Sequence, residues 1–226
     1  TYRRTAVRLT RIKKRKKKRR TAVRLYRTKI MKKIILIIAI IGLSACNSSK
    51  EKNKIDENTS KEMISENNKE KINDTVPYED SVMLLGKANR KGFQMDAFKN
   101  WFNTGYENYK VDSESLEKLK PLLKDATITV FMGTWCEDSQ RETPHFYKIL
   151  DEANFDESKL TLITVSDEKT TPQGFEEGKN ITNVPTLIFY KNDKELGRIV
   201  EYPIESLEKD MLAILSGKEY KHAYAE

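Results

Sequence analysis

The sequence has few of the residues that form metal sites or phosphate-binding loops. Among 226 residues it contains two cysteines and two histidines, and His145 and His222 lie far apart. No His, Cys and carboxylate cluster has the spacing of a metal site. The nine glycines form no glycine-rich phosphate loop. We therefore expect no metal and no other cofactor.

Long hydrophobic runs are also missing. The apolar run Ile34–Ile41 is much shorter than the roughly 20 residues that a transmembrane helix needs. It follows Met31 and two lysines and leads into Leu43-Ser44-Ala45-Cys46, the pattern of an export signal. This segment resembles the lipobox of bacterial lipoproteins, in which the cysteine is acylated. We expect lipidation of Cys46; the alternative is an ordinary signal peptide with an incidental cysteine.

Lipidation of Cys46 would leave Cys136 as the one free thiol, so no internal disulfide is expected. Two or more acyl chains anchor a protein stably. The expected location is therefore extracytoplasmic, at a membrane facing the periplasm or the cell surface, and the lipid anchor is the expected contact with the membrane.

Residues 1–30 contain fifteen Lys or Arg and no acidic residue. Such a segment is typical of a tail that binds nucleic acid or another anionic surface. We interpret it instead as an upstream extension, because residues 31–45 form a complete lipoprotein signal peptide with its own methionine. Removing residues 1–45 leaves 25 basic and 34 acidic residues, a net charge of −9. The expected mature protein therefore has no electrostatic basis for nucleic-acid binding.

Composition divides the remaining chain in two. Residues 46–77 are rich in Asn, Lys, Glu and Ser and lack aromatic residues, which predicts a lipidated, disordered tether. Residues 78–226 carry the apolar and aromatic residues of one folded domain, which we expect to be a monomer.

Hydrophobic periodicity predicts an α/β domain. Aromatic residues at 98, 102, 106 and 109 have helical spacing, which favours a helix face packed on a sheet over a groove for a partner. A helix is expected over 113–124, capped by Asp112 or Ser113, and buried strands are expected before Cys136 and over 160–165. Residues 172–179 are expected to form a loop or short helix. A hairpin of 186–190 and 197–202, with its turn at 191–194, should precede a helix over 205–216 capped by Gly217. Strand-helix alternation followed by a hairpin and a helix fits a three-layer α/β sandwich with a central sheet flanked by helices.

Cys136 lies where the first of these buried strands meets the start of a helix. The free N–H groups and the dipole of a helix N-terminus favour a thiolate, whereas Glu137 and Asp138 disfavour it. The alternative is a buried structural cysteine, but the C-terminal end of a strand is where α/β sheets place their ligand sites.

The segment Trp135-Cys136-Glu137-Asp138-Ser139 resembles the Trp-Cys-x-x-Cys site of thioredoxin-like proteins, with serine in place of the second cysteine. Pro144 resembles the proline that kinks their active-site helix, and Val184-Pro185-Thr186 resembles their cis-proline loop. The resemblance covers about residues 112–217. It implies a thioredoxin-like fold with a mixed central sheet, a cis Pro185, and a substrate groove formed by Val184 and Pro185 opposite Cys136.

Two departures from the family pattern bear on mechanism. Ser139 cannot resolve a mixed disulfide, although it can donate a hydrogen bond to the thiolate. Val130 stands where many thioredoxins have a buried aspartate. The leading hypothesis is a monothiol thioredoxin-like protein in which Cys136, supported by Trp135 and Ser139, exchanges with envelope proteins or small thiols. The alternative is a non-catalytic binding module on the same fold.

Overall fold

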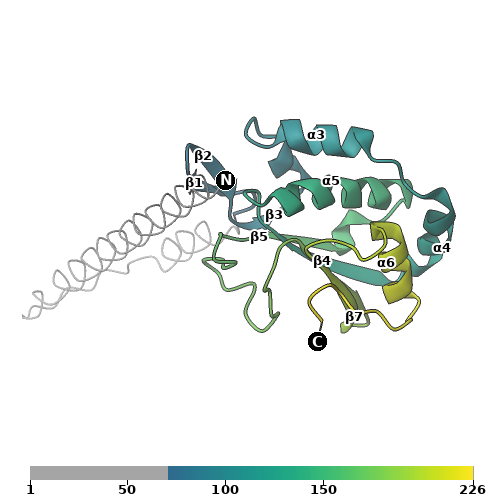
Figure 1. The fold of residues 1–226 in the computed structure, drawn as a ribbon. Helices are drawn as coiled ribbons and strands as arrows, with labels where there is room; N and C mark the ends of the chain where they lie inside the picture. Colours follow the sequence, from purple (N-terminus) through teal and green to yellow (C-terminus); the bar gives the residue numbers. More distant parts are fainter. Residues whose placement is uncertain (1–70, 226) are drawn as a thin grey trace, which may run out of the picture. The chain divides into compact units, whose positions relative to one another are not determined.

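The structure is a computed structural model that describes residues 71–225, and its elements form a mixed α/β domain (Figure 1). The strands are β1 (Thr75–Tyr78), β2 (Ser81–Leu84), β3 (Gly86–Ala88), β4 (Ala126–Met132), β5 (Leu160–Thr164), β6 (Thr186–Lys191) and β7 (Lys194–Val200). The α-helices are α3 (Lys99–Asn108), α4 (Ser113–Leu123), α5 (Glu137–Glu152) and α6 (Leu207–Leu215), with short 3-10 helices η2 (Arg90–Gln94) and η3 (Glu157–Lys159).

Five of these strands form one sheet in the order β3-β5-β4-β6-β7. Strand β4 pairs in parallel with β5 and antiparallel with β6, while β3 and β7 add antiparallel edges. This mixed sheet with its helices confirms the predicted thioredoxin-like α/β fold. The end of the central strand β4 leads directly to Cys136, so the fold places the thiol at the C-terminal edge of the sheet.

One face of the sheet carries the larger hydrophobic core. Alternate residues of β4, Ile128, Val130 and Met132, are buried there together with side chains from α3, α4, α5 and α6. Because side chains alternate along a strand, the residues between them face the other way. Burial of this face holds the helices on the sheet.

The opposite face carries a second cluster, formed by Phe131, Ile163, Val165, Val184 and Ile188. Phe175 and Ile181, from the segment between β5 and β6, pack against it. Residues 172–179 form turns, so the loop alternative of the sequence prediction holds and a loop covers this face. The same segment continues into Val184 and Pro185. The loop that covers this face of the sheet therefore also supplies residues of the candidate site.

The aromatic stripe of α3 is packed, as predicted, but chiefly against other helices. Phe102 stacks on Phe93 of η2, with ring centroids 4.9 Å apart, and meets Tyr147 of α5 edge-on at 5.7 Å. Tyr106 donates a 2.6 Å hydrogen bond from its hydroxyl to Asp151 of α5. Helix α3 therefore forms an outer layer on α5, the helix that begins at Cys136 (Figure 1).

The predicted hairpin exists with a shorter turn. Asn192 and Asp193 both have positive φ, 51° and 61°, and form the whole turn, so Lys191 pairs with Lys194. Strand β7 consequently starts three residues before the predicted Gly197 and ends at Val200 rather than Tyr202. Asn and Asp tolerate this left-handed conformation, which explains why two residues suffice.

The predicted start of the folded domain also needs correction. Strand β1 begins at Thr75, inside the expected tether, and pairs antiparallel with β2 from Thr75↔Leu84 to Tyr78↔Ser81. Cys46 and the segments 1–30 and 31–45 lie outside the described residues. Among residues 71–225, no helix is long and apolar enough to cross a membrane.

Candidate functional site

Cys136 lies at the junction of β4 and α5. The turn Gly133-Thr134-Trp135 reverses the chain, and the Cys136 N–H donates to the Gly133 carbonyl at 3.0 Å. Cys136 is the N-cap of α5, with extended φ and ψ of −94° and 124°. Its free thiol is half-buried, so part of the side chain remains accessible at the helix start.

The thiol faces the loop that precedes β6. Cys136 Sγ donates a 3.2 Å hydrogen bond to the carbonyl of Val184, 48 residues away. The Val184–Pro185 peptide bond is cis, as expected. The loop is fixed locally because the Thr186 hydroxyl donates to the Asn183 carbonyl at 2.7 Å. The structure therefore brings together the two motifs that the sequence placed in one site.

Trp135 packs on the second hydrophobic cluster and forms one wall of the turn. Its indole Nε1 donates to the Val165 carbonyl at 2.9 Å. A Cβ at Gly133 would lie 2.5 Å from atoms of the Trp135 ring, so only glycine leaves room for the ring. The indole is thereby fixed against the turn that precedes Cys136.

Ser139 is hydrogen-bonded to the turn that precedes Cys136. Its side chain is fully buried at 0% exposure, and its Oγ accepts a 3.2 Å hydrogen bond from the Gly133 N–H. No hydrogen bond joins Ser139 to Cys136 Sγ in the described part of the chain. Ser139 therefore supports the turn before the thiol, and its hydrogen bond to the thiolate stays a prediction.

Two supporting residues were not found from the sequence. Thr134 is buried, and its hydroxyl accepts a 3.1 Å hydrogen bond from the Leu84 N–H of β2. The Gln140 side chain donates from Nε2 to the Thr134 carbonyl at 2.8 Å. The first contact spans fifty residues, so no local pattern could have indicated it. Together they hold the turn from the β2 side and from the first turn of α5.

The acidic residues around the thiol are partly neutralised. Asp138 accepts a 2.7 Å hydrogen bond from Arg141, which also donates from Nε to Glu142 at 2.7 Å. Burial raises the pKa of Glu142, and the adjacent Arg141 opposes that rise. Glu137 is exposed to solvent. Of the two carboxylates next to Cys136, only Glu137 therefore lies outside this ion-pair network.

Beneath the site, Val130 is 2% exposed and belongs to the larger hydrophobic core. The structure therefore has an apolar side chain at the position where the resemblance expects a buried carboxylate. Within residues 71–225, no group of three or more His, Cys, Asp or Glu side chains is arranged to hold a metal ion.

A strand, a tight turn and a helix-capping thiol opposite a cis-proline loop define a thioredoxin-like domain. The family model described as Thioredoxin matches residues 93–213, more than half of the chain. The chain belongs to the thioredoxin family. The match includes both site motifs and begins before residue 112, where the sequence resemblance was expected to start.

Solved structures with weaker similarity were also found. A protein of unknown function from Pseudomonas aeruginosa is 17% identical, with 54% of this chain and 82% of that chain covered and a TM-score of 0.40. Mitochondrial thioredoxin 3 from Saccharomyces cerevisiae, in its oxidised form, is 21% identical, with coverages of 38% and 76% and a TM-score of 0.26. No curated protein matches this chain. The family assignment rests on the family model.

Proposed function

We propose that this protein is a membrane-anchored, extracytoplasmic thioredoxin-like protein that exchanges thiols and disulfides through the single cysteine Cys136. The observation that carries the proposal is the half-exposed thiol at the start of α5, held 3.2 Å from the Val184 carbonyl. A structural cysteine has no need of this position. The proposed partners are envelope proteins with thiols or disulfides, or small thiols.

The reaction needs one thiol in the protein and one outside it. The Cys136 thiolate attacks one sulfur of a disulfide R–S–S–R, forms a Cys136–S–S–R mixed disulfide and releases RS⁻. An external thiolate then attacks the mixed disulfide, takes up the R–S group as a new disulfide and regenerates the Cys136 thiolate. Ser139 cannot perform this second step, because it has no sulfur and its Oγ is bonded to the Gly133 N–H.

Val184 and Pro185 are the proposed contact for the substrate. They stand directly opposite the sulfur and enter β6, so an extended substrate segment on this loop would pass the thiol. Such a segment would pair with the loop backbone as an added strand, and its side chains would provide selectivity.

A non-catalytic binding module is the second candidate. The Val184 carbonyl already accepts the thiol hydrogen, Ser139 is committed to the turn, and Val130 offers no proton-transfer group. These features suit a groove that binds a partner without turnover. Fold alone does not separate the two functions.

Trapping the mixed disulfide tests the proposal. With a chromogenic aromatic disulfide under native conditions, the protein is expected to form a one-to-one adduct that mass spectrometry maps to Cys136. An external monothiol should remove the adduct, and Cys136→Ser should form none at this position. If Cys136 is modified only after denaturation, the binding-module function is correct instead.

The proposed anchor rests on Cys46 and the short apolar run before it. Cys46→Ala is expected to move the protein from the membrane fraction to the soluble fraction, because acyl chains contribute about 0.8 kcal/mol per buried CH₂. Fractionation with immunoblotting measures the change, with Cys136→Ser as the matched cysteine control. Equal membrane retention of Cys46→Ala and the unaltered protein would refute the lipid anchor.

A further inference from the structure

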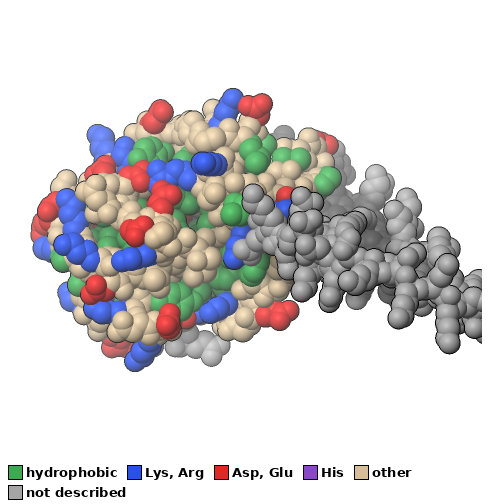
Figure 2. All heavy atoms as spheres, turned by 180° about the vertical axis from the view of Figure 1, so that it is seen from behind, with side chains coloured by type: hydrophobic (Ala, Val, Ile, Leu, Met, Phe, Trp, Pro, Cys, Tyr) green, Lys and Arg blue, Asp and Glu red, His purple; other side chains and the backbone are tan. Residues whose placement is uncertain are grey.

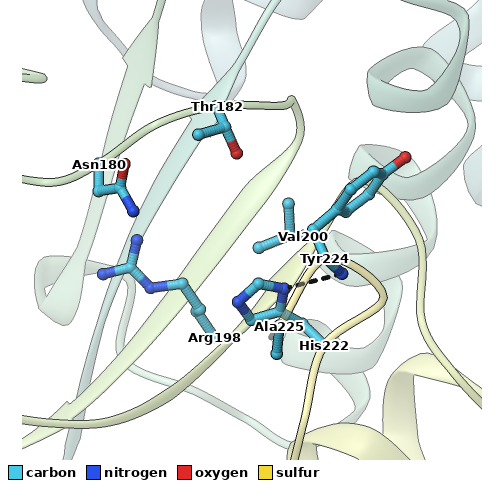
Figure 3. A pocket seen from close by; sticks show the side chains of 7 residues that line it. All are labelled: Asn180, Thr182, Arg198, Val200, His222, Tyr224 and Ala225. Carbon is cyan, nitrogen blue, oxygen red and sulfur yellow. Dashed lines mark hydrogen bonds between the residues drawn. The ribbon is translucent and has the colours of Figure 1, made fainter.

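A cavity of about 540 Å³ lies beside the loop that carries Val184 (Figure 3). Three segments enclose it: the loop before β6, the edge strand β7, and the C-terminal residues after α6. Its lining residues are Asn180, Thr182, Arg198, Val200, His222, Tyr224 and Ala225. The C-terminal wall lies beyond residues 93–213, so the cavity is not contained in the part of the chain that matches the family.

Arg198 supplies positive charge to this cavity. Its side chain is 17% exposed, and its Nε and Nη2 donate to Glu195 at 2.6 and 2.7 Å. Nη1 donates to the Lys179 carbonyl at 2.7 Å. A guanidinium has five N–H groups, so two form no hydrogen bond to the described residues. Figure 3 shows the Arg198 guanidinium and the Asn180 side-chain amide turned toward one another.

His222 adds a hydrogen-bond donor, and a backbone contact determines which ring nitrogen carries the hydrogen. Its Nδ1 accepts a 3.2 Å hydrogen bond from the Tyr224 N–H, so the neutral ring carries its hydrogen on Nε2. Burial lowers the pKa of His222, and the positive charge of Arg198 lowers it further, while Glu195 acts in the opposite direction.

The lining combines donors with a small apolar wall. Arg198, Asn180, Thr182 and His222 all carry N–H or O–H donors. None of the seven lining residues is acidic, although Glu195 pairs with Arg198. Val200 and Ala225 provide apolar surface. Such donors, together with the guanidinium charge, suit an oxyanion. The cavity volume lies within the roughly 300 to 1,000 Å³ of small-molecule sites.

We propose that this cavity binds the carboxylate or phosphate group of a small organic anion. The site is independent of the thiol chemistry, but it borders the same loop. Thr182 is two residues from Val184, at most about 7 Å along an extended chain. A ligand bound here would therefore lie next to the proposed substrate groove.

Nuclear magnetic resonance of the histidine rings tests this site in the full-length protein. The chain has only two histidines, and His145 stacks on Tyr109 at 4.2 Å, away from the cavity lining. Inorganic phosphate and N-acetylglycine are the anionic probes, and N-acetylglycinamide is the neutral control. We expect an anion to shift the His222 resonances saturably and to raise the pH midpoint of His222, with His145 unchanged.

Variants distinguish specific anion binding in the cavity from a general effect of added ions on His222. Arg198→Gln should weaken the response by about tenfold or more, whereas Arg141→Gln, an arginine outside the cavity, should retain it. Asn180→Ala provides a second variant, which leaves the Arg198–Glu195 pair intact and should also weaken binding. Saturation by phosphate alone identifies a phosphate ester as the ligand, and saturation by N-acetylglycine alone a carboxylate. The proposal would be overturned by the absence of a His222 shift, by an equal shift with chloride, or by a response in Arg198→Gln and Asn180→Ala as strong as that of the unaltered protein.

Discussion

Ser139→Cys is expected to convert the single-cysteine site into one that closes an internal disulfide with Cys136 and gains dithiol-driven reductase turnover. Side chains three positions apart at the start of a helix are neighbours, and this spacing is that of Cys-x-x-Cys disulfides. The new thiol would replace a side chain that is fully buried beneath the turn. Free-thiol counting and a disulfide-reduction assay measure the change, which starts from nearly no turnover.

Ser139→Ala is the matched control for this substitution. It removes the acceptor for the buried Gly133 N–H without adding a thiol, which costs about 1 to 3 kcal/mol. It should therefore be less stable but equally unable to close an internal disulfide. If Ser139→Cys folds normally yet neither forms the disulfide nor reduces substrate, the site is not suited to thiol exchange and the binding-module function is favoured.

The sequence predicted the central part of the fold because its signals there are local. The run Thr127–Val130 is long and β-branched, and Asp138 and Ser139 suit the first turn of a helix, so the β4-turn-α5 unit could be recognised. The strands β1, β2 and β3 were missed. Each has only three or four residues, and their position depends on non-local contacts such as the Leu84–Thr134 hydrogen bond.

The candidate site was predictable in its motifs but not in its hydrogen bonds. The meeting of Cys136 with Val184 followed from a family resemblance, since no local pattern relates residues 48 positions apart. The buried Ser139 side chain bonds to a backbone N–H six residues earlier, which only the turn geometry determines. The cavity was missed as well, because its walls come from three separate segments and its lining residues form no motif.

The distribution of surface charge likewise could not be predicted from composition. On the face of the described residues seen in Figure 2, Lys and Arg side chains are interspersed with Asp and Glu. Arg141 and Arg198 are examples of bases held by neighbouring carboxylates. Net charge therefore describes the whole chain, whereas the anion site proposed beside β7 depends on a local arrangement of side chains.

Phe93→Ala is expected to cause a large loss of stability, of about 3 to 5 kcal/mol. Phe93 is fully buried at 0% exposure, stacks on Phe102 at 4.9 Å, and meets Trp101 and Tyr147 edge-on at 5.6 and 6.0 Å. Its removal leaves a cavity between η2, α3 and α5. Urea unfolding followed by tryptophan fluorescence measures the free energy of unfolding.

Two further variants keep this prediction testable if Phe93→Ala does not fold, since a domain has only about 5 to 15 kcal/mol of stability in total. Phe93→Leu retains part of the buried volume and should lose less than Phe93→Ala, whereas Met95→Ala, at a side chain 37% exposed, should lose little. Equal losses for Phe93→Leu and Met95→Ala would show that η2 does not hold α3 on α5. Folded Phe93→Leu should react with the chromogenic disulfide at Cys136 as fast as the unaltered protein, because Phe93 belongs to one hydrophobic cluster while Cys136 and Val184 belong to the other.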